Sequence, residues 1–152
     1  MNNEQLTTYR VTGKQTAISF IFKYNLNGDL KVFEIVGEPL SEAQKSWLFG
    51  AYRFPIDEEK IILWTKMPEF VAKFKVEKIP ADLSFDRLWE AYNYKMGKKD
   101  ALKVFNKLKE PEIIKVFLSL KGYEAHLKRT GQAKAYLATY LNKEYYNNEY
   151  QL

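Results

Sequence analysis

Cysteine is absent from this chain of 152 residues, and histidine occurs once, at His126. A protein without thiols can form neither a disulfide nor a thiolate metal site. No Ser, Cys or carboxylate stands at a spacing from His126 that is typical of a catalytic triad, so a structural role for this residue is favoured. These absences predict a protein that is not an enzyme and that uses no metal and no cofactor.

Glycine and long apolar runs are also scarce. The seven glycines lie too far apart to build a phosphate-binding loop or a dinucleotide-binding turn. The longest apolar stretches, such as residues 61–64, have the length of core segments and fall far short of the ~20 residues that cross a bilayer. Residues 1–5 lack the basic and apolar regions of a signal peptide. We therefore expect a cytoplasmic protein with no membrane partner.

Aromatic residues and basic charge are what the chain has in quantity. Apolar residues make up 46% of the sequence and aromatic residues 16%, so the chain can build a packed core as one domain or as two small lobes. The net charge is +5, of which +4 falls in residues 82–152 and +1 in residues 1–81. Such a balance permits an anionic partner through electrostatic steering, although many basic domains bind no nucleic acid.

The N-terminal third has the pattern of β-strands. Segments 6–11, 16–24 and 30–36 are rich in β-branched and aromatic residues, and Asn27-Gly28 between the last two predicts a hairpin turn. In the segment 30–36, Phe33 and Ile35 alternate with Val32, Glu34 and Val36. One face is thus wholly apolar and the other is partly polar, which indicates a sheet covered on one side.

Two short helices and an edge strand are expected next. Ser41 and Gln44 have the spacing of a capping box at the start of a helix over residues 42–49. A second helix is expected to begin at Asp57 and to stop before Pro68. Residues 73–78 alternate Lys and Glu with apolar side chains, which is typical of an exposed edge strand.

The best domain boundary lies at residues 79–84. Pro80 disfavours helix in the residue before it, and Ser84 can cap the helix that follows. Helical periodicity then predicts segments 85–96, 98–108, 111–128 and 133–146. The expected fold class is therefore α+β: an N-terminal β-hairpin or small antiparallel sheet with two short helices (residues 1–81), followed by a C-terminal bundle of about four helices (residues 82–152).

Lysines form the most prominent pattern in the helical half. Lys95, Lys99, Lys103 and Lys107 recur every four residues across Gly97, and on a continuous helix they would form one cationic stripe. Phosphate groups favour such a stripe because counterions are released when they bind it. The alternative is that these lysines simply cover the wet side of an amphipathic helix. The full set of candidate nucleic-acid-binding residues is Lys95, Lys98, Lys99, Lys103 and Lys107, with Lys128, Arg129 and Lys134 as a second patch.

Tyrosines form the second pattern, near the C-terminus. Tyr136 and Tyr140 share a helical face and are expected in the core. Tyr145, Tyr146 and Tyr150 stand in a polar setting, and the sequence leaves three roles open for them. They could stack on unpaired bases, dock on a protein partner, or pack back on the body of the protein.

Two blocks of the helical half resemble a segment of phage and prophage replication-associated proteins. Residues 85–101 (FDRLWEAYNYKMGKKDA) are similar to its pattern F-x-x-F/L-W-x-x-Y-P-x-K-x-G-K-x-x-A, and residues 105–108 match the aromatic and K-L pair that follow. Residues 138–146 (ATYLNKEYY) are similar to its A-T-W-L-N-x-x-R-W ending. The chain lacks the Pro after Tyr92 and the final Arg-Trp. The N-terminal part loosely resembles small proteins from phages and mobile elements of Bacteroidetes.

The resemblance implies a role in DNA replication through binding DNA or a helicase, without catalysis. We therefore expect a non-enzymatic DNA-binding accessory protein of phage or mobile-element replication, with the preference for single- or double-stranded DNA left open. The alternative is a protein-interaction adaptor, either helicase-loader-like or an inhibitor of a host factor. In that case the aromatic tail or the edge of the sheet would be the contact surface.

Overall fold

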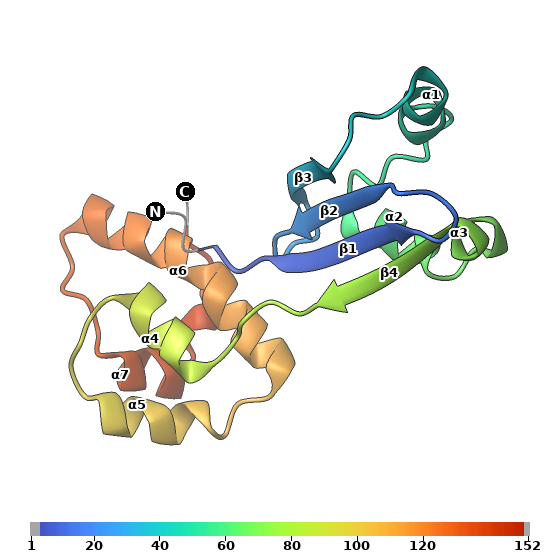
Figure 1. The fold of residues 1–152 in the computed structure, drawn as a ribbon. Helices are drawn as coiled ribbons and strands as arrows, with labels where there is room; N and C mark the ends of the chain where they lie inside the picture. The colour runs from blue at the N-terminus through green and yellow to red at the C-terminus, as the bar shows by residue number, and fades with distance from the viewer. Residues whose placement is uncertain (1–3, 151–152) are drawn as a thin grey trace. The chain divides into compact units, whose positions relative to one another are not determined.

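Residues 4–150 are described in a computed structural model, and they form two compact units, residues 4–81 and 82–150 (Figure 1). The first unit is built on a four-stranded antiparallel sheet. Its strands are β1 (Thr7–Gly13), β2 (Ser19–Tyr24), β3 (Leu30–Val36) and β4 (Phe74–Ile79), in the order β3-β2-β1-β4. The fold is therefore α+β, and the expected edge strand near residues 73–78 is confirmed as β4.

The hairpin between β2 and β3 is confirmed where Asn27-Gly28 predicts it. The side chain of Asn25 accepts hydrogen bonds from the backbone N–H groups of Asn27 (3.0 Å) and Asp29 (2.9 Å). Gly28 has φ +87°, a conformation that glycine adopts without steric penalty. Local turn chemistry therefore determines this connection.

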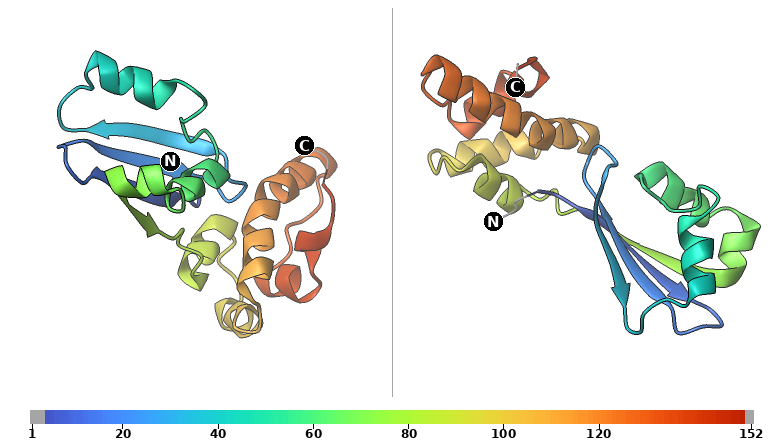
Figure 2. Two further views of the ribbon diagram at one scale, coloured as in Figure 1. Left: turned by 90° about the vertical axis from the view of Figure 1, so that its right-hand side faces the viewer. Right: turned by 90° about the horizontal axis from the view of Figure 1, so that it is seen from above.

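Three helices, α1 (Glu42–Phe49), α2 (Glu58–Trp64) and α3 (Pro68–Lys73), lie on one side of the sheet (Figure 2). The capping box at α1 is confirmed: Gln44 N–H donates to Ser41 Oγ (3.2 Å), and Ser41 N–H donates to Gln44 Oε1 (2.8 Å). The expectation of two helices was wrong by one. Pro68 begins α3, because a proline in the first turn of a helix has no N–H group to leave unsatisfied.

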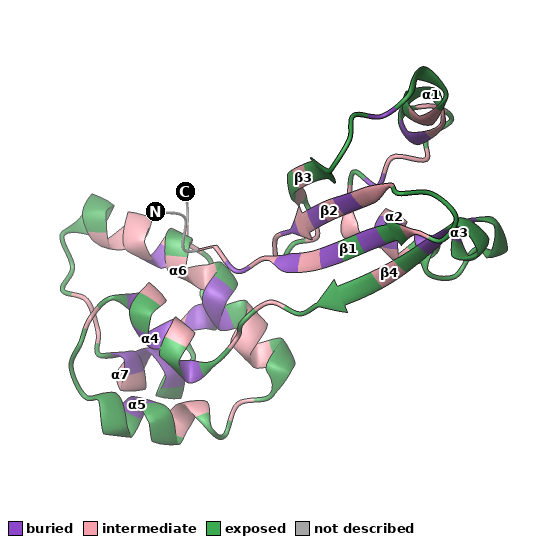
Figure 3. Ribbon diagram, viewed as in Figure 1, coloured by how far each residue is buried: buried purple, intermediate pink, exposed green. Residues whose placement is uncertain are grey.

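Phenylalanine and tryptophan rings dominate the core between the sheet and these helices. Trp64 stacks on Phe70, with ring centroids 5.1 Å apart and planes 4° from parallel, and on Phe74 at 5.4 Å. Phe20 and Phe22 reach the same core from β2, and both are fully buried. Burial is concentrated on the central strands, whereas much of the edge strands β3 and β4 is exposed (Figure 3).

The second unit is helical. It contains α4 (Phe85–Tyr92), α5 (Lys98–Phe105), the long α6 (Glu110–Thr130), α7 (Leu137–Asn142) and a 3₁₀ helix η1 (Tyr145–Asn147). The helix expected over residues 85–96 ends at Tyr92, because Asn93 adopts a left-handed conformation with φ 55°. The helix expected over residues 133–146 was also too long, and only residues 137–142 form it.

One face of α4 is apolar and faces the core, since Phe85, Leu88, Trp89 and Tyr92 are all buried. The prediction that Tyr136 lies in the core was wrong. Its side chain is 49% exposed, because the residue precedes α7 as its N-cap. None of the helices formed by residues 4–150 combines the length and the apolar character needed to cross a membrane.

Candidate nucleic-acid interface

Helix α5 and the turn that follows it carry a group of exposed lysines. Ala101 is its one buried residue and faces the interior, while Lys99 and Lys103 lie one turn apart on the exposed side. Lys107 follows in the turn after the helix and is also exposed. Among the described residues, none of these three lysines forms an ion pair.

Lys95 does not continue this row as the sequence pattern predicted. It lies in the loop 93–97 between α4 and α5, so no continuous helix joins it to Lys99. Its ammonium group forms an ion pair with Glu90 (2.8 Å) and donates to the carbonyl of Trp89 (3.3 Å). The hydrogen bond from Lys95 holds the pKa of the Glu90 carboxyl below its ordinary value. The predicted stripe of four lysines is therefore a row of three, Lys99, Lys103 and Lys107. Lys95 lies beside this row, and its charge is partly neutralised by Glu90.

Lys98 is the first residue of α5, and its ammonium group lies near an aromatic ring. Its ammonium lies 5.9 Å from the centroid of the Trp89 ring, and Lys95 lies 5.6 Å from the same centroid. Cations this close to an indole ring are attracted to its face. Both lysines are exposed, and Trp89 holds their ammonium groups near the start of α5.

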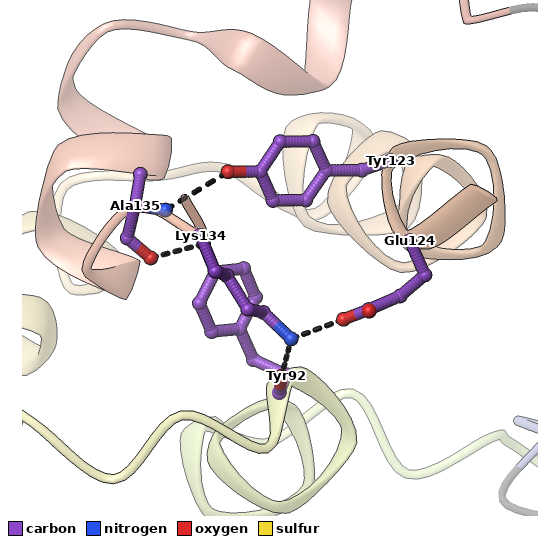
Figure 4. Close-up of polar contacts among 5 residues, drawn as sticks. All are labelled: Tyr92, Tyr123, Glu124, Lys134 and Ala135. Atoms are coloured by element: carbon purple, nitrogen blue, oxygen red, sulfur yellow. Dashed lines mark hydrogen bonds and ion pairs between the residues drawn. The ribbon is translucent and has the colours of Figure 1, made fainter. Parts of the chain in front are cut away.

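Lys134 is a structural residue (Figure 4). Its ammonium group donates to the backbone carbonyl of Tyr92 and to the carboxylate of Glu124, and it lies 4.5 Å from the centroid of the Tyr92 ring. Its side chain is only 18% exposed. Because the charge is already matched by Glu124 and largely removed from solvent, Lys134 has little capacity left for a phosphate.

Lys128 and Arg129 lie in the last turn of α6. Arg129 Nη2 lies 3.3 Å from His126 Nδ1, and His126 Nε2 lies 3.3 Å from Gln132 Oε1. The 21 residues of α6 span about 30 Å at 1.5 Å per residue, so these two cations are far from the lysines that precede the helix. The structure thus keeps them apart from Lys107.

Two of the terminal tyrosines, Tyr146 and Tyr150, pack against the rest of the second unit. Tyr146 is 6% exposed, so its ring packs inside the unit and is not accessible to a base. The Tyr150 hydroxyl donates to the carbonyl of Tyr145 (3.1 Å), and its ring lies against Tyr123 (5.6 Å between centroids) and His126 (5.2 Å). Burial raises the pKa of both Tyr146 and Tyr150. Of the three roles that the sequence left open, packing on the body describes Tyr146 and Tyr150 in this structure.

Two further cations on α6, Lys115 and Lys121, were not among the sequence candidates. Both are exposed, and neither forms an ion pair with any residue between 4 and 150. Their signal was available in the sequence, because they occupy polar positions of an amphipathic helix that follows the row on α5. The described chain has no group of three or more His, Cys, Asp or Glu residues suited to a metal ion.

One family model matches the chain. It is described as the Legionella vir region protein LvrA C-terminal domain, a family associated with mobile elements, and it matches residues 80–144. The matched segment contains α4, α5, α6 and α7. No curated protein and no solved structure matches the chain.

Proposed function

We propose that this chain is a non-enzymatic DNA-binding accessory protein of a mobile element, and that α5 is its main contact with the phosphate backbone. The observation that carries the proposal is the segment 98–109, which contains five lysines and one acidic residue, Asp100. Four of these lysines, at 99, 103, 107 and 109, are exposed and have no ion pair among the described residues.

Electrostatics favours an anion at this segment. Lys99 and Lys103 are like charges one helical turn apart, an arrangement that destabilises a helix by about 0.2–0.5 kcal/mol per pair in the absence of a counter-charge. A phosphate backbone supplies repeated negative charges and gains free energy by releasing condensed counterions. The matched family is associated with mobile elements, which is compatible with a function that involves DNA. The proposal of DNA binding itself is supported by the exposed lysines of the segment 98–109.

Fluorescence anisotropy with labelled single- and double-stranded oligonucleotides tests the proposal. The charge-reversal variant Lys99→Glu with Lys103→Glu should weaken binding at low salt. Its plot of log K against log salt should become shallower by about 1.8 on duplex DNA or about 1.4 on a single strand, as two phosphate contacts are lost.

The matched control reverses two exposed, unpaired lysines of the first unit, Lys66→Glu with Lys78→Glu. It makes the same change in net charge and should leave the salt slope unchanged. No binding of the unaltered chain at low salt would remove the proposal, and so would equal losses in the two variants.

A protein-interaction adaptor is the second candidate, and a specific patch favours it. Around the loop that joins α1 to α2, Phe49 is 55% exposed, Tyr52 is 95% exposed and Ile56 is 55% exposed. Ala51 and Tyr52 both have positive φ values, of 50° and 58°, which are unfavourable for residues other than glycine. Exposed apolar side chains on a strained loop are typical of a contact surface for another protein.

Replacing Tyr52 and Ile56 by serine separates the two candidate functions. Under the adaptor function, this variant loses a partner that co-purifies from the host, while the control Leu63→Ser, at a position 49% exposed on α2, keeps it. DNA affinity should be the same in both variants. If the partner co-purifies with the lysine variants but not with the serine variant, and the unaltered chain does not bind DNA, the adaptor function replaces DNA binding.

A further inference from the structure

A second, chemically different site lies in the first unit. A cavity of about 360 Å³ opens between β2, α1 and the junction of α3 with β4. The rings of Phe20, Trp47 and Phe74 form its wall, and the centroids of Trp47 and Phe74 are 5.6 Å apart. Trp47 is only half-buried. An indole ring that the fold leaves partly uncovered, inside a mostly aromatic cavity, is a feature of small-molecule sites.

Small residues keep this cavity open. Ala43 on α1 and Ala72 on α3 line it and are exposed, so neither helix covers the Trp47 ring with a larger side chain. A Leu or Phe at either position would extend over the opening. The cavity therefore depends on side-chain size at two surface positions, and it can be closed by substitutions that leave the buried core untouched.

The loop after β1 forms a fixed side of the cavity. Lys14 N–H donates to the carbonyl of Lys73 (2.9 Å), and Gly13 N–H donates to the carbonyl of Ile18 (2.8 Å). A Cβ atom on Gly13 would lie 2.8 Å from the backbone oxygen of Thr16, which cannot move without changing the turn, so the turn favours glycine at this position. Because these backbone hydrogen bonds connect the loop to the end of α3, the cavity is part of the folded unit.

The charges around the cavity favour an anion. The Lys73 ammonium lies 4.9 Å from the centroid of Trp47, and the guanidinium carbon of Arg53 lies 5.3 Å from it. Within residues 4–150 neither cation forms an ion pair, even though Glu69 stands one helical turn before Lys73. No lining residue of the cavity is acidic.

We propose that this cavity binds a small aromatic carboxylate, with its ring against Trp47 and Phe74 and its carboxylate at Lys73. The volume suits the ring system, since an apolar cavity of ~150 Å³ holds benzene and this one is large enough for two fused rings. The amide groups of Gln15 and Gln44 also line the cavity and offer N–H donors to the same carboxylate. The site is independent of the lysines on α5.

Titration of the unaltered 152-residue chain with 2-naphthoate, and with 2-naphthalenemethanol as its neutral counterpart, tests the proposal. Two-dimensional ¹⁵N–¹H NMR follows the indole N–H of Trp47 and the amide of Phe74. Both ligands should shift these signals saturably. The carboxylate should bind about three- to fivefold more tightly, the size expected for one partly exposed ion pair.

Two variants assign the site. Lys73→Gln should remove the preference for the carboxylate while keeping neutral binding, and Lys66→Gln on the same unit should change neither. Ala72→Leu should weaken both ligands about tenfold or more by filling the space of the ring. Ala43→Leu, on α1, repeats this test from another helix that lines the cavity.

Three results would overturn the proposal. The first is no saturable shift of the Trp47 and Phe74 signals at millimolar ligand. The second is equal affinity of the unaltered chain for the carboxylate and the alcohol. The third is unchanged binding in both alanine variants. None of these results bears on DNA binding, because that proposal rests on Lys99 and Lys103 of the second unit, and the anisotropy experiment uses neither the residues that line the cavity nor these ligands.

Discussion

The two units both rely on aromatic residues, but they differ in which rings fill the core. Tyr9 and Tyr24 are the buried tyrosines of the first core, whose other rings come from Phe and Trp, whereas tyrosine is the main ring at the centre of the second. In the first unit Phe20, Phe22, Trp64 and Phe70 pack ring against ring, and the phenylalanines bring no polar group into the core. In the second unit tyrosines meet at the centre and their hydroxyls are bonded. Tyr92 donates to the carbonyl of Ala135 (2.6 Å), and the Tyr123 hydroxyl accepts from the backbone N–H of Ala135 (3.0 Å).

This difference has a structural reason. The sheet and helices of the first unit satisfy most of their backbone groups internally, so apolar rings fill most of the space between them. The exception is the loop between α1 and α2, where the carbonyl of Pro55 accepts from the Tyr24 hydroxyl (2.7 Å) and the carbonyl of Arg53 accepts from Trp64 Nε1 (3.2 Å). The second unit contains the non-helical segment between α6 and α7, whose backbone groups have no helical partners. The hydroxyls of Tyr92 and Tyr123 form hydrogen bonds with the backbone of Ala135 in this segment. The Lys134 ammonium donates in the other direction, to the carbonyl of Tyr92, so the segment is attached to both α4 and α6.

The largest expected effect is in the apolar core. Trp64→Ala removes a ring that is 2% exposed, and we expect the free energy of unfolding of the first unit to fall by about 3–5 kcal/mol. Hydrogen exchange resolved along the chain measures this loss in residues 4–81. A loss below about 1 kcal/mol would contradict the role of stacked rings in this unit.

A smaller effect is expected from the polar network of the second unit. Lys134→Met keeps the aliphatic volume but leaves the Tyr92 carbonyl and Glu124 without their ammonium partner. We expect a loss of about 1–2 kcal/mol, reduced from the value for a buried pair because Glu124 is half-exposed. The control is Lys95→Met, whose exposed ion pair with Glu90 should leave stability almost unchanged. Equal losses in the two variants would show that Lys134 is an ordinary surface lysine.

The smallest expected effect is the loss of stability that each buried tyrosine contributes at alkaline pH, and it should appear in both units. Burial raises the pKa of Tyr9 and Tyr24 in the first unit, and of Tyr92 and Tyr140 in the second, above the ordinary value of 10.0. The folded chain keeps these protons where the unfolded chain releases them. Stability is therefore complete below pH 10 and is lost above it.

Denaturant unfolding between about pH 8 and pH 11 measures this loss. Each buried tyrosine should lower the free energy of unfolding by at most about 1.4 kcal/mol per pH unit above pH 10. Tyr140→Phe should make the decline in the second unit shallower. A free energy of unfolding that stays flat to pH 11 would contradict the burial of these hydroxyls.

Local structure was largely predictable from the sequence. The Asn27-Gly28 turn and the Ser41 capping box each depend on residues within three or four positions of one another, and both are confirmed. The helix boundaries that the sequence analysis missed are also set by local residues, but these residues are compatible with two different local structures. Pro68 could end one helix or begin another, and Asn93 could continue α4 or stop it in a left-handed conformation.

The candidate interface was less predictable, because charge depends on neighbours that are distant in the sequence. The sequence by itself determined the strands, most of the helices and the abundance of lysine in the helical half. Only the tertiary structure decided which lysines have partners: Lys134 meets the carbonyl of Tyr92 from 42 positions away, whereas Lys99 and Lys103 have no ion pair among the described residues. The physical reason is that an ammonium group is neutralised by whichever acceptor the fold brings within a few ångströms, and spacing along the chain does not contain that information.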